Sequence, residues 1–293
     1  MAENINEIKI SGAGYPEALK EIPFPPKKIS VWSKNGALPK AKYYLSIVGT
    51  RRHSAYGEEI LRKILAGLAP YGFATVSGMA VGIDTIAAKA SLENKIPTIG
   101  ILGSGLSRET FYPPKNWNLA EKIVEAGGAV VSEYEHDMKA TLWSFPQRNR
   151  IISGLSLVTL VIEAPEKSGA LITTKFALEQ NRDIFAVPQN IYNENAKGVN
   201  NLIKMGAKLV TSAEDIIEEL NIETAVNFKK TSGDIVFAPD EELLMSLLAK
   251  EPMHIDSIIR ESKISAAKAN SLLSMLEIKG AIKNAGGGMY CKI

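Results

Sequence analysis

The chain has 293 residues, of which 45% are hydrophobic and 23% are charged, and its formal net charge is only +2. This composition excludes a disordered or fibrous chain, and the near-neutral balance excludes a uniformly basic coat for nucleic acid. The single cysteine, Cys291, excludes an intrachain disulfide and a multi-cysteine metal cluster, and it suits a reducing cytoplasm. We expect a cytoplasmic protein without a membrane span, because even the apolar-rich stretch Leu155–Ile162 is far too short to cross a bilayer.

Residues 1–40 are rich in glycine and proline, and we interpret them as an irregular N-terminal extension packed on the core. Residues 41–220 then alternate short apolar runs with helical patterns. The apolar runs predict strands at residues 44–48, 74–76, 98–102, 129–131, 158–162, 184–187 and 208–210. The helical patterns lie at residues 56–68, 83–92, 118–125, 169–180 and 200–205. This alternation indicates an α/β fold, with a mostly parallel sheet covered on both faces.

Residues 221–239 lose this periodicity and are interpreted as a linker. Residues 240–293 contain three helical stretches followed by two short strands around Gly286-Gly287-Gly288, which is the layout of a small winged-helix domain. This domain carries seven cations and seven acids. A neutral domain is as consistent with protein contact or dimer support as with duplex DNA binding, and of these we expect an accessory or protein-contact role.

Polar, glycine-containing loops follow several of the predicted strands. Such loops present backbone N–H groups and helix N-termini to an anion, at the edge where doubly wound sheets bind ligands. The candidate phosphate-binding residues in these loops are Gly49, Arg51, Ser54, Ser77, Gly78, Gly82, Gly103, Ser168 and Gly169. A single glycine turn of this kind is more often a packing feature, but several together suggest a phosphate-lined pocket.

A second dense feature combines cations with aromatic rings between Lys139 and Arg150. Phe145, Arg148, Asn149 and Arg150 belong to it, and this combination suits stacking on unpaired bases while arginines hold the backbone. Alternatively, Arg148 and Arg150 pair with acids such as Glu133 or Glu163 and only fix the loop. Lys175, on the helix after Gly169, either faces the same crevice or is an ordinary exposed lysine.

Other chemistries find little support. The histidines are far apart, and the nucleophile-elbow and triphosphate-loop motifs are absent. Gly103-Ser104-Gly105 lacks the third glycine of the dinucleotide fingerprint, so we expect neither a nicotinamide nor a flavin cofactor, and no metal.

These motifs resemble the DNA-processing protein A (DprA, or Smf) family. The resemblance runs from about Tyr15 to the C-terminus. It rests on Gly49-x-Arg51-x-x-Ser54-x-Tyr56-Gly57, Ser77-Gly78-x-Ala80-x-Gly82-Ile83-Asp84, Tyr112-Pro113-x-x-Asn116, Ser132-Glu133, Phe145-Pro146-x-Arg148-Asn149-Arg150-Ile151-Ile152, Glu163-Ala164, Ser168-Gly169, Leu171-Ile172-Thr173, Ala186-Val187-Pro188 and Gly198-x-Asn200-x-Leu202-Ile203-x-x-Gly206-Ala207. Ala88 departs from the usual histidine and Gln189 from the usual glycine. Residues 1–40 leave no room for the helical N-terminal domain of many relatives.

The resemblance implies an extended Rossmann-like, homodimeric core that binds single-stranded DNA, protects incoming DNA and loads the RecA recombinase in natural transformation, without catalytic turnover. It places Arg51 at a phosphate contact, the loops at Ser54, Ser77-Gly78 and Ser168-Gly169 around the pocket, and Thr173 and Lys175 on a contacting helix. The alternative is a nucleotide or nucleoside-phosphate hydrolase that uses Asp84 or Glu163 as its general base. A protein-interaction scaffold is a third reading.

Overall fold

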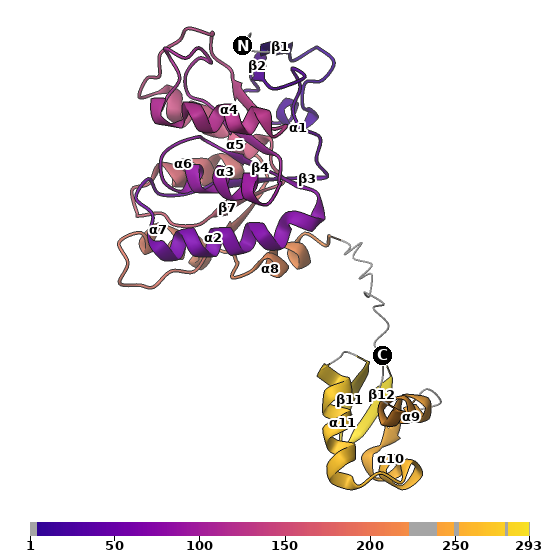
Figure 1. Cartoon of the computed structure of the whole chain (residues 1–293). Helices are drawn as coiled ribbons and strands as arrows, with labels where there is room; N and C mark the ends of the chain where they lie inside the picture. The colour runs from indigo at the N-terminus through magenta and orange to yellow at the C-terminus, as the bar shows by residue number, and fades with distance from the viewer. Residues whose placement is uncertain (1–4, 223–238, 249–251, 279–280, 293) are drawn as a thin grey trace. The chain divides into compact units, whose positions relative to one another are not determined.

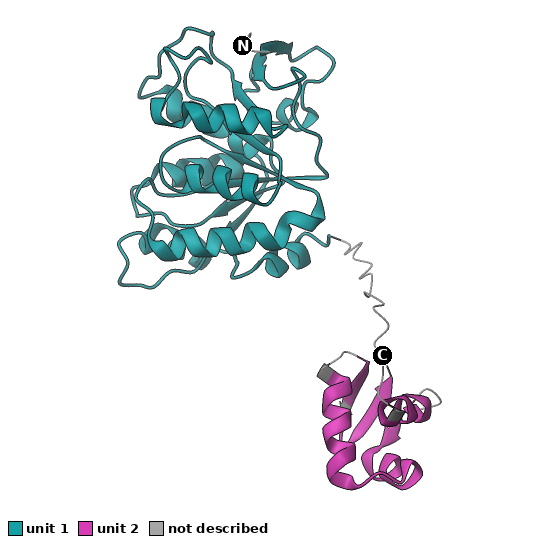
Figure 2. Ribbon diagram, in the orientation of Figure 1, with its two compact units in different colours: residues 1–224 teal, residues 225–293 magenta. Residues whose placement is uncertain are grey.

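The computed structural model of the chain describes residues 5–222, 239–248, 252–278 and 281–292. It divides into two compact units, residues 1–224 and residues 225–293 (Figure 2). Of the predicted linker, residues 223–238 lie outside the described residues.

A nine-stranded sheet forms the centre of the first unit, in the order β1-β2-β6-β5-β4-β3-β7-β8-β9 (Figure 1). In chain order the strands are β1 (Ile5–Lys9), β2 (Lys28–Trp32), β3 (Tyr43–Val48), β4 (Phe73–Ser77), β5 (Thr98–Ile101), β6 (Ala129–Ser132), β7 (Val158–Val161), β8 (Asp183–Ala186) and β9 (Lys208–Leu209). Strands β3 to β9 pair in parallel, whereas β2 joins β6 and β1 joins β2 in antiparallel fashion. The predicted α/β fold with a mostly parallel sheet is confirmed.

Helices cover both faces of this sheet (Figure 1). They are α1 (Glu17–Lys20), α2 (Ala55–Leu68), α3 (Ile83–Glu93), α4 (Trp117–Glu125), α5 (Ser144–Gly154), α6 (Gly169–Glu179), α7 (Ala196–Lys204) and α8 (Ala213–Glu219), with short 3₁₀ turns η1 (Ala69–Tyr71) and η2 (Pro114–Asn116). On one face, Ile64 of α2 and Ile216 of α8 pack with Ile47 of β3. On the other face, Ile151 of α5 and Ala177 of α6 belong to a second buried cluster. Two apolar layers therefore bury the parallel strands, which is why those strands read as uninterrupted apolar runs.

The N-terminal segment is more regular than its sequence suggested. Strands β1 and β2 lie within residues 1–40, and β2 extends the sheet by pairing Ser30 with Ser132 of β6. Within β1 only Ile8 is buried, so its sequence lacks the apolar run that marked the central strands. The segment is thus the antiparallel edge of the sheet.

The chain reverses its direction of winding at β3. Strand β3 lies between β4, which leads on to β5 and β6, and β7, which leads on to β8 and β9. Loops that leave β3 and β7 therefore diverge and open a crevice at the C-terminal ends of these strands, as in other doubly wound sheets.

The second unit contains three helices and a three-stranded sheet. Its elements are α9 (Pro239–Leu248), β10 (Met253–His254), α10 (Ile255–Ser262), α11 (Ala266–Ile278), β11 (Ile282–Gly286) and β12 (Met289–Lys292). Leu244, Ile258, Leu273 and Leu276 form its core. Three helices followed by a glycine-tipped hairpin confirm the predicted winged-helix layout, to which the structure adds the short strand β10.

Across the described residues, no helix combines the length and the apolar character that a membrane crossing requires.

Candidate functional site

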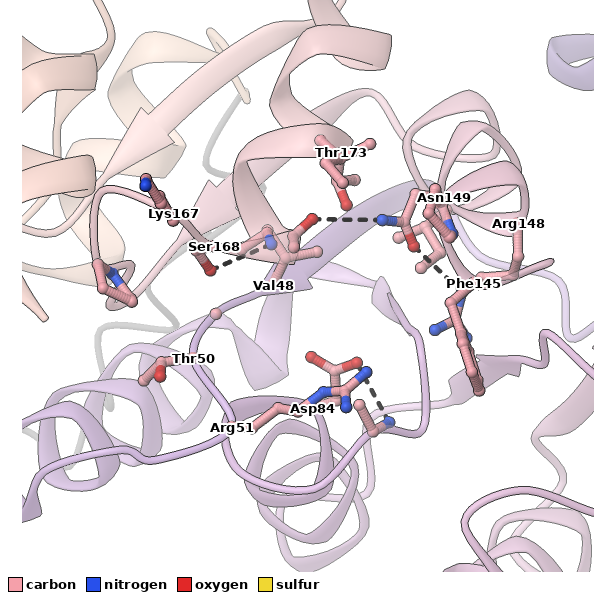
Figure 3. Close-up of a pocket in the computed structure, with 18 of the residues that line it drawn as sticks. Val48, Thr50, Arg51, Asp84, Phe145, Arg148, Asn149, Lys167, Ser168 and Thr173 are labelled. Carbon is pink, nitrogen blue, oxygen red and sulfur yellow. Dashed lines mark hydrogen bonds between the residues drawn. The ribbon is translucent and has the colours of Figure 1, made fainter. Parts of the chain in front are cut away.

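A cavity of about 560 Å³ opens where the loops after β3 and β7 diverge (Figure 3). Segments from five parts of the chain surround it: the β3–α2 loop, the start of α3, the segment before η2, the start of α5 and the start of α6. Its lining includes Gly49, Thr50, Arg51, Arg52, Asp84, Tyr112, Leu142, Phe145, Arg148, Asn149, Lys167, Ser168, Gly169 and Thr173. The crevice predicted from the strand-end loops is therefore a real cavity.

The loop after β3 is fixed by its backbone. The Thr50 N–H donates to the carbonyl of Glu163 at 2.7 Å, and the Thr50 carbonyl accepts from the Ile83 N–H at 3.2 Å. These bonds join the loop to the end of β7 and to the first turn of α3. Arg51, the next residue, is exposed, and its guanidinium carbon lies 5.9 Å from the centre of the Phe145 ring. The loop thus presents Arg51 to the cavity from a rigid base.

Gly82 permits this loop to pack closely. Its φ is +86°, and a Cβ at this position would lie 2.6 Å from the Cα of Arg51. Any side chain here would push the arginine loop away, so glycine is required for both backbone conformation and space.

The N-terminus of α6 forms the opposite wall. The Ser168 hydroxyl caps the helix by accepting from the Ala170 N–H at 3.2 Å, and a Cβ added at Gly169 would meet no atom within 4 Å. Lys167 is exposed beside this cap. A helix N-terminus with an adjacent lysine and a bare glycine favours a bound anion.

The floor of the cavity depends on Arg148, which is 5% exposed. Its guanidinium donates to the carbonyls of Gly78, at 2.5 Å, and of Ile101, and to the Asn149 side chain at 3.2 Å. The Asn149 amide in turn donates to the Gly169 carbonyl at 3.3 Å. Arg148 and Asn149 therefore connect the ends of β4 and β5 to the start of α6.

Asp84 also lines the cavity, although it is only 8% exposed. Its carboxylate accepts from the backbone N–H groups of Gly78, at 3.0 Å, and Ala80, at 3.3 Å. Burial raises the pKa of Asp84 to about 6, against the opposing effects of Arg148 and these N–H donors, and burial lowers the pKa of Arg148 to about 10. Both groups hold the loop after β4 in place.

Arg150 and Glu163 are engaged inside the fold. Arg150 makes a two-pronged ion pair with Glu133, at 3.0 and 2.6 Å, which is one of the two alternatives that the sequence left open. Glu163 is fully buried and accepts from the backbone N–H of Ser54, at 2.8 Å, and from its hydroxyl. Neither residue lines the cavity.

An aromatic surface completes the rim. The rings of Phe145 and Tyr112 lie 5.3 Å apart, and Tyr112 is exposed. Gly103 makes room for Phe145, because a Cβ there would lie 2.9 Å from the ring. Leu142, which is 92% exposed, also lines the cavity.

The structure thus separates the candidate residues into two groups. Those that line the cavity are Gly49, Arg51, Phe145, Arg148, Asn149, Ser168, Gly169 and Thr173. Those that do not line it are Ser54, Ser77, Gly78, Gly82, Gly103, Arg150 and Lys175. Of the second group, Gly78 borders a smaller adjoining hollow with Arg51, Phe145 and Arg148, and Lys175 is exposed on α6.

Several lining residues were not among the selected candidates, and those that could contact DNA include Arg52, Tyr112 and Lys167. Arg52 and Lys167 each stand next to a motif residue, and Tyr112 belongs to the Tyr112-Pro113-x-x-Asn116 motif, so these positions were the available signal. Arg51, Arg52 and Lys167 have no acidic side chain within 4.0 Å among the described residues. The one acid in the lining, Asp84, is only 8% exposed, so the exposed charges around the cavity are mainly positive.

Comparison with known proteins identifies two matching families, one for each unit. The profile of DNA recombination-mediator protein A matches residues 6–221, and that of the DprA winged helix domain matches residues 236–288. Protein Smf of Escherichia coli is 36% identical over 280 residues, covering 90% of this chain and 74% of its own. The DNA processing protein DprA of Bacillus subtilis is 41% identical over 218 residues, covering 74% and 72%.

Two solved structures are similar as well. DprA of Streptococcus pneumoniae superposes with a TM-score of 0.67 at 37% identity, covering 73% of this chain and 74% of its own. DprA of Helicobacter pylori, whose structure concerns its mode of binding single-stranded DNA, gives a TM-score of 0.65 at 28% identity, covering 75% and 98%. The order of motifs, the winged-helix unit and these matches agree, and the chain belongs to the DNA recombination-mediator protein A (DprA/Smf) family.

Proposed function

We propose that this protein binds single-stranded DNA in the cavity between α6 and the β3–α2 loop. The observation that carries the proposal is the exposure of Arg51, Arg52 and Lys167, with no ion pair within 4.0 Å among the described residues, in a cavity also lined by the rings of Phe145 and Tyr112. Cations for the phosphates and rings for the bases are the two elements that sequence-independent single-strand binding requires. The single-stranded DNA binding reported for the Helicobacter pylori relative supports the same function.

In this proposal Arg51, Arg148 and Arg150 have different roles. Arg51 contacts phosphate, because it is exposed over the cavity. Arg148 and Arg150 shape the site, because their guanidinium groups are buried and bonded to protein atoms. Asn149 and the N-terminus of α6 add polar contacts from the far wall.

We also propose that the protein binds single-stranded DNA without catalysing a reaction. The rival hydrolase needs Asp84 or Glu163 as a base that reaches a reacting atom. Asp84 is only 8% exposed and accepts from two backbone N–H groups, and the fully buried Glu163 accepts from Ser54 and does not line the cavity. This engagement favours structural roles for both acids, and a substrate-cleavage assay with nucleotides is expected to show no turnover.

We further propose that the bound strand is incoming DNA, protected in the cytoplasm and passed to the RecA recombinase during natural transformation. Membership of the DprA/Smf family supports this role. Strand-exchange assays in which RecA competes with a single-strand binding protein test it, with stimulation expected from this protein and none from an Arg51→Ala variant.

We also propose a homodimer. An apolar surface lies beside the edge strand β9, where Leu178, Met205 and Leu209 are 61%, 78% and 44% exposed. Exposed apolar patches and open sheet edges mark association surfaces, and twofold dimers are the commonest assemblies. Light scattering is expected to give a dimer mass, and Met205→Lys is expected to shift it toward the monomer.

Titration of oligo-dT over a range of salt concentrations tests the binding function directly. Affinity is expected to fall as salt rises, because bound phosphates release counterions. Arg51→Ala is expected to cost about 1–3 kcal/mol of binding free energy, the scale of a lost charged hydrogen bond. Arg108→Ala, at an exposed arginine outside the cavity, is the matched control. Salt-independent affinity, or unaltered binding by a folded Arg51→Ala variant, would exclude this function or this site.

A further inference from the structure

A second surface hollow lies between α3 and α4, with a volume of about 620 Å³. Its lining comes from α3, η2 and α4, and we call it the lysine groove. The lining residues are Thr85, Lys89, Leu92, Glu93, Lys115, Asn116, Asn118, Leu119 and Lys122. Nothing in the site described above uses these residues.

The charge of the lysine groove is strongly one-sided. Lys89, Lys115 and Lys122 are exposed, and within the described ranges no acidic side chain lies within 4.0 Å of any of them. Glu93, the one acid in the lining, is ion-paired with Arg62 on the neighbouring helix α2. Three unneutralised cations from three different elements therefore converge on one hollow, which fits a polyanion.

The groove is connected to the cavity through its floor. The buried Asn116 donates to the carbonyl of Met79, at 2.7 Å, and to the Thr85 hydroxyl, at 2.9 Å. Thr85 in turn donates to the carbonyl of Ala80 at 2.7 Å, and Ala80 lines the cavity. The floor of the groove and the wall of the cavity thus share one short backbone segment.

Residues 112–116 also connect the cavity and the lysine groove along the chain. Tyr112 lines the cavity, Pro113 lines the small adjoining hollow, and Lys115 and Asn116 line the groove. The Tyr112 ring, paired with Phe145, therefore stands where the cavity gives way to the groove. An aromatic pair at this position offers a stacking surface at the point where a strand would leave the cavity.

We propose that the lysine groove carries the continuation of the single strand that occupies the cavity. Lys89, Lys115 and Lys122 then bind successive phosphates beyond the stacked bases at Tyr112. This inference rests on the proposed function. It adds that the bound strand extends beyond the cavity and leaves it past Tyr112 toward the lysine groove.

Oligonucleotide length separates the groove from the cavity. The experiment compares the full chain with a Lys89→Gln/Lys115→Gln/Lys122→Gln variant on two oligo-dT lengths, roughly 6 and roughly 20 nucleotides, chosen around the ~4–16-nucleotide sites of single-strand binding folds. Lys40→Gln/Lys63→Gln/Lys204→Gln is the matched control, because these lysines are exposed and line neither hollow. Thermal melts confirm that both variants fold.

The groove variant is expected to bind the short oligonucleotide as tightly as the unaltered chain does. It is expected to bind the long oligonucleotide roughly tenfold or more weakly. On the long oligonucleotide, the slope of log K against log salt is expected to fall by about 2, because three phosphate contacts are lost. The control variant is expected to retain the slope. An unchanged slope on the long oligonucleotide overturns the proposal and leaves the lysines to an acidic protein surface. Equal losses on both lengths also overturn it, since the substitutions would then act on the cavity. If the unaltered chain binds neither length, it is the proposed function that fails.

Discussion

Arg148 and Asp84 hold the same residue, Gly78, from its two sides. The Arg148 guanidinium donates to the Gly78 carbonyl at 2.5 Å, and the Gly78 N–H donates to the Asp84 carboxylate at 3.0 Å. The two charged groups are both buried, one entering from α5 and the other from α3. The loop after β4, which contributes to the cavity floor, is therefore fixed by an acid and a base that are only 8% and 5% exposed.

We expect Arg148→Met to act on stability. The substitution removes donors from two buried carbonyls, of Gly78 and Ile101, and leaves Asp84 without its compensating charge. The expected loss is about 2–5 kcal/mol in the free energy of unfolding, measured by chemical denaturation. The double variant Arg148→Met/Asp84→Asn is expected to lose less than the sum of the single losses, because the two groups compensate each other. Strict additivity would contradict the coupling.

Asp84 should make stability depend on pH in a defined window. Its pKa is raised from 3.8 to about 6 in the folded chain, so between these values the folded state binds the proton more tightly than the unfolded state. The contribution of Asp84 to the free energy of unfolding therefore falls as pH rises through this window, by on the order of 2–3 kcal/mol.

The difference in unfolding free energy between the unaltered chain and Asp84→Asn isolates this effect from the other carboxylates. The unfolding free energy of the unaltered chain is expected to fall relative to that of Asp84→Asn between about pH 4 and pH 6, and the difference is expected to stay level above pH 6. A difference that stays constant over the same range would show that folding does not raise the pKa of Asp84.

The parallel core could be predicted because its strands are continuous apolar runs, whereas α5 could not be recognised as a buried helix. Phe145-Pro146-Gln147-Arg148-Asn149-Arg150 is polar and suggests an exposed basic segment. Arg148 and Arg150 are buried because the Gly78 carbonyl and Glu133, distant in sequence, satisfy them. Such partners exist only after folding, so local sequence cannot distinguish a buried arginine from a DNA contact.

The exposed residues of the site could be predicted only in part. Arg51 could be selected because it lies in a strand-end loop, and its exposure agrees with that selection. Lys167 was missed although it directly precedes the cap residue Ser168, because a lysine in a loop carries no pattern of its own. The sequence located the loops, and only the fold showed which of their side chains point into one cavity.

We expect Gly82→Ala to disturb the arginine loop. The new methyl group would approach the Cα of Arg51, and φ of +86° would strain any side chain. Gly127→Ala is a matched control, because Gly127 has the same φ but open space around it. Both variants are expected to lose about 1–3 kcal/mol of stability through backbone strain. Gly82→Ala alone is expected to weaken oligo-dT binding as well, and equal DNA affinities in the two variants would contradict the packing argument.

The Phe145 ring is expected to contribute stacking. Phe145→Leu keeps an apolar side chain but removes the aromatic face that stands beside Tyr112 and under Arg51. Binding of oligo-dT is expected to weaken by about 1–3 kcal/mol, the range measured for one base on one ring. Phe145→Tyr should restore most of the affinity, because it retains the face. If leucine binds as well as phenylalanine does, no base stacks here.

The winged-helix unit is expected to contribute little to single-strand affinity. Where such units bind duplex DNA, a recognition helix supplies cations and base contacts. In α11 the exposed side chains include Asn270, Ser274 and Met275, and Lys268 is already ion-paired with Asp240 at 2.5 Å. A chain ending at Ile222 should therefore keep the oligo-dT affinity and salt dependence of the full chain, measured by fluorescence anisotropy. The full chain should also bind a duplex of equal length no more tightly than the truncated chain does. A truncated chain that binds oligo-dT markedly more weakly would place a DNA contact in this unit, whereas equal binding favours protein contacts for it.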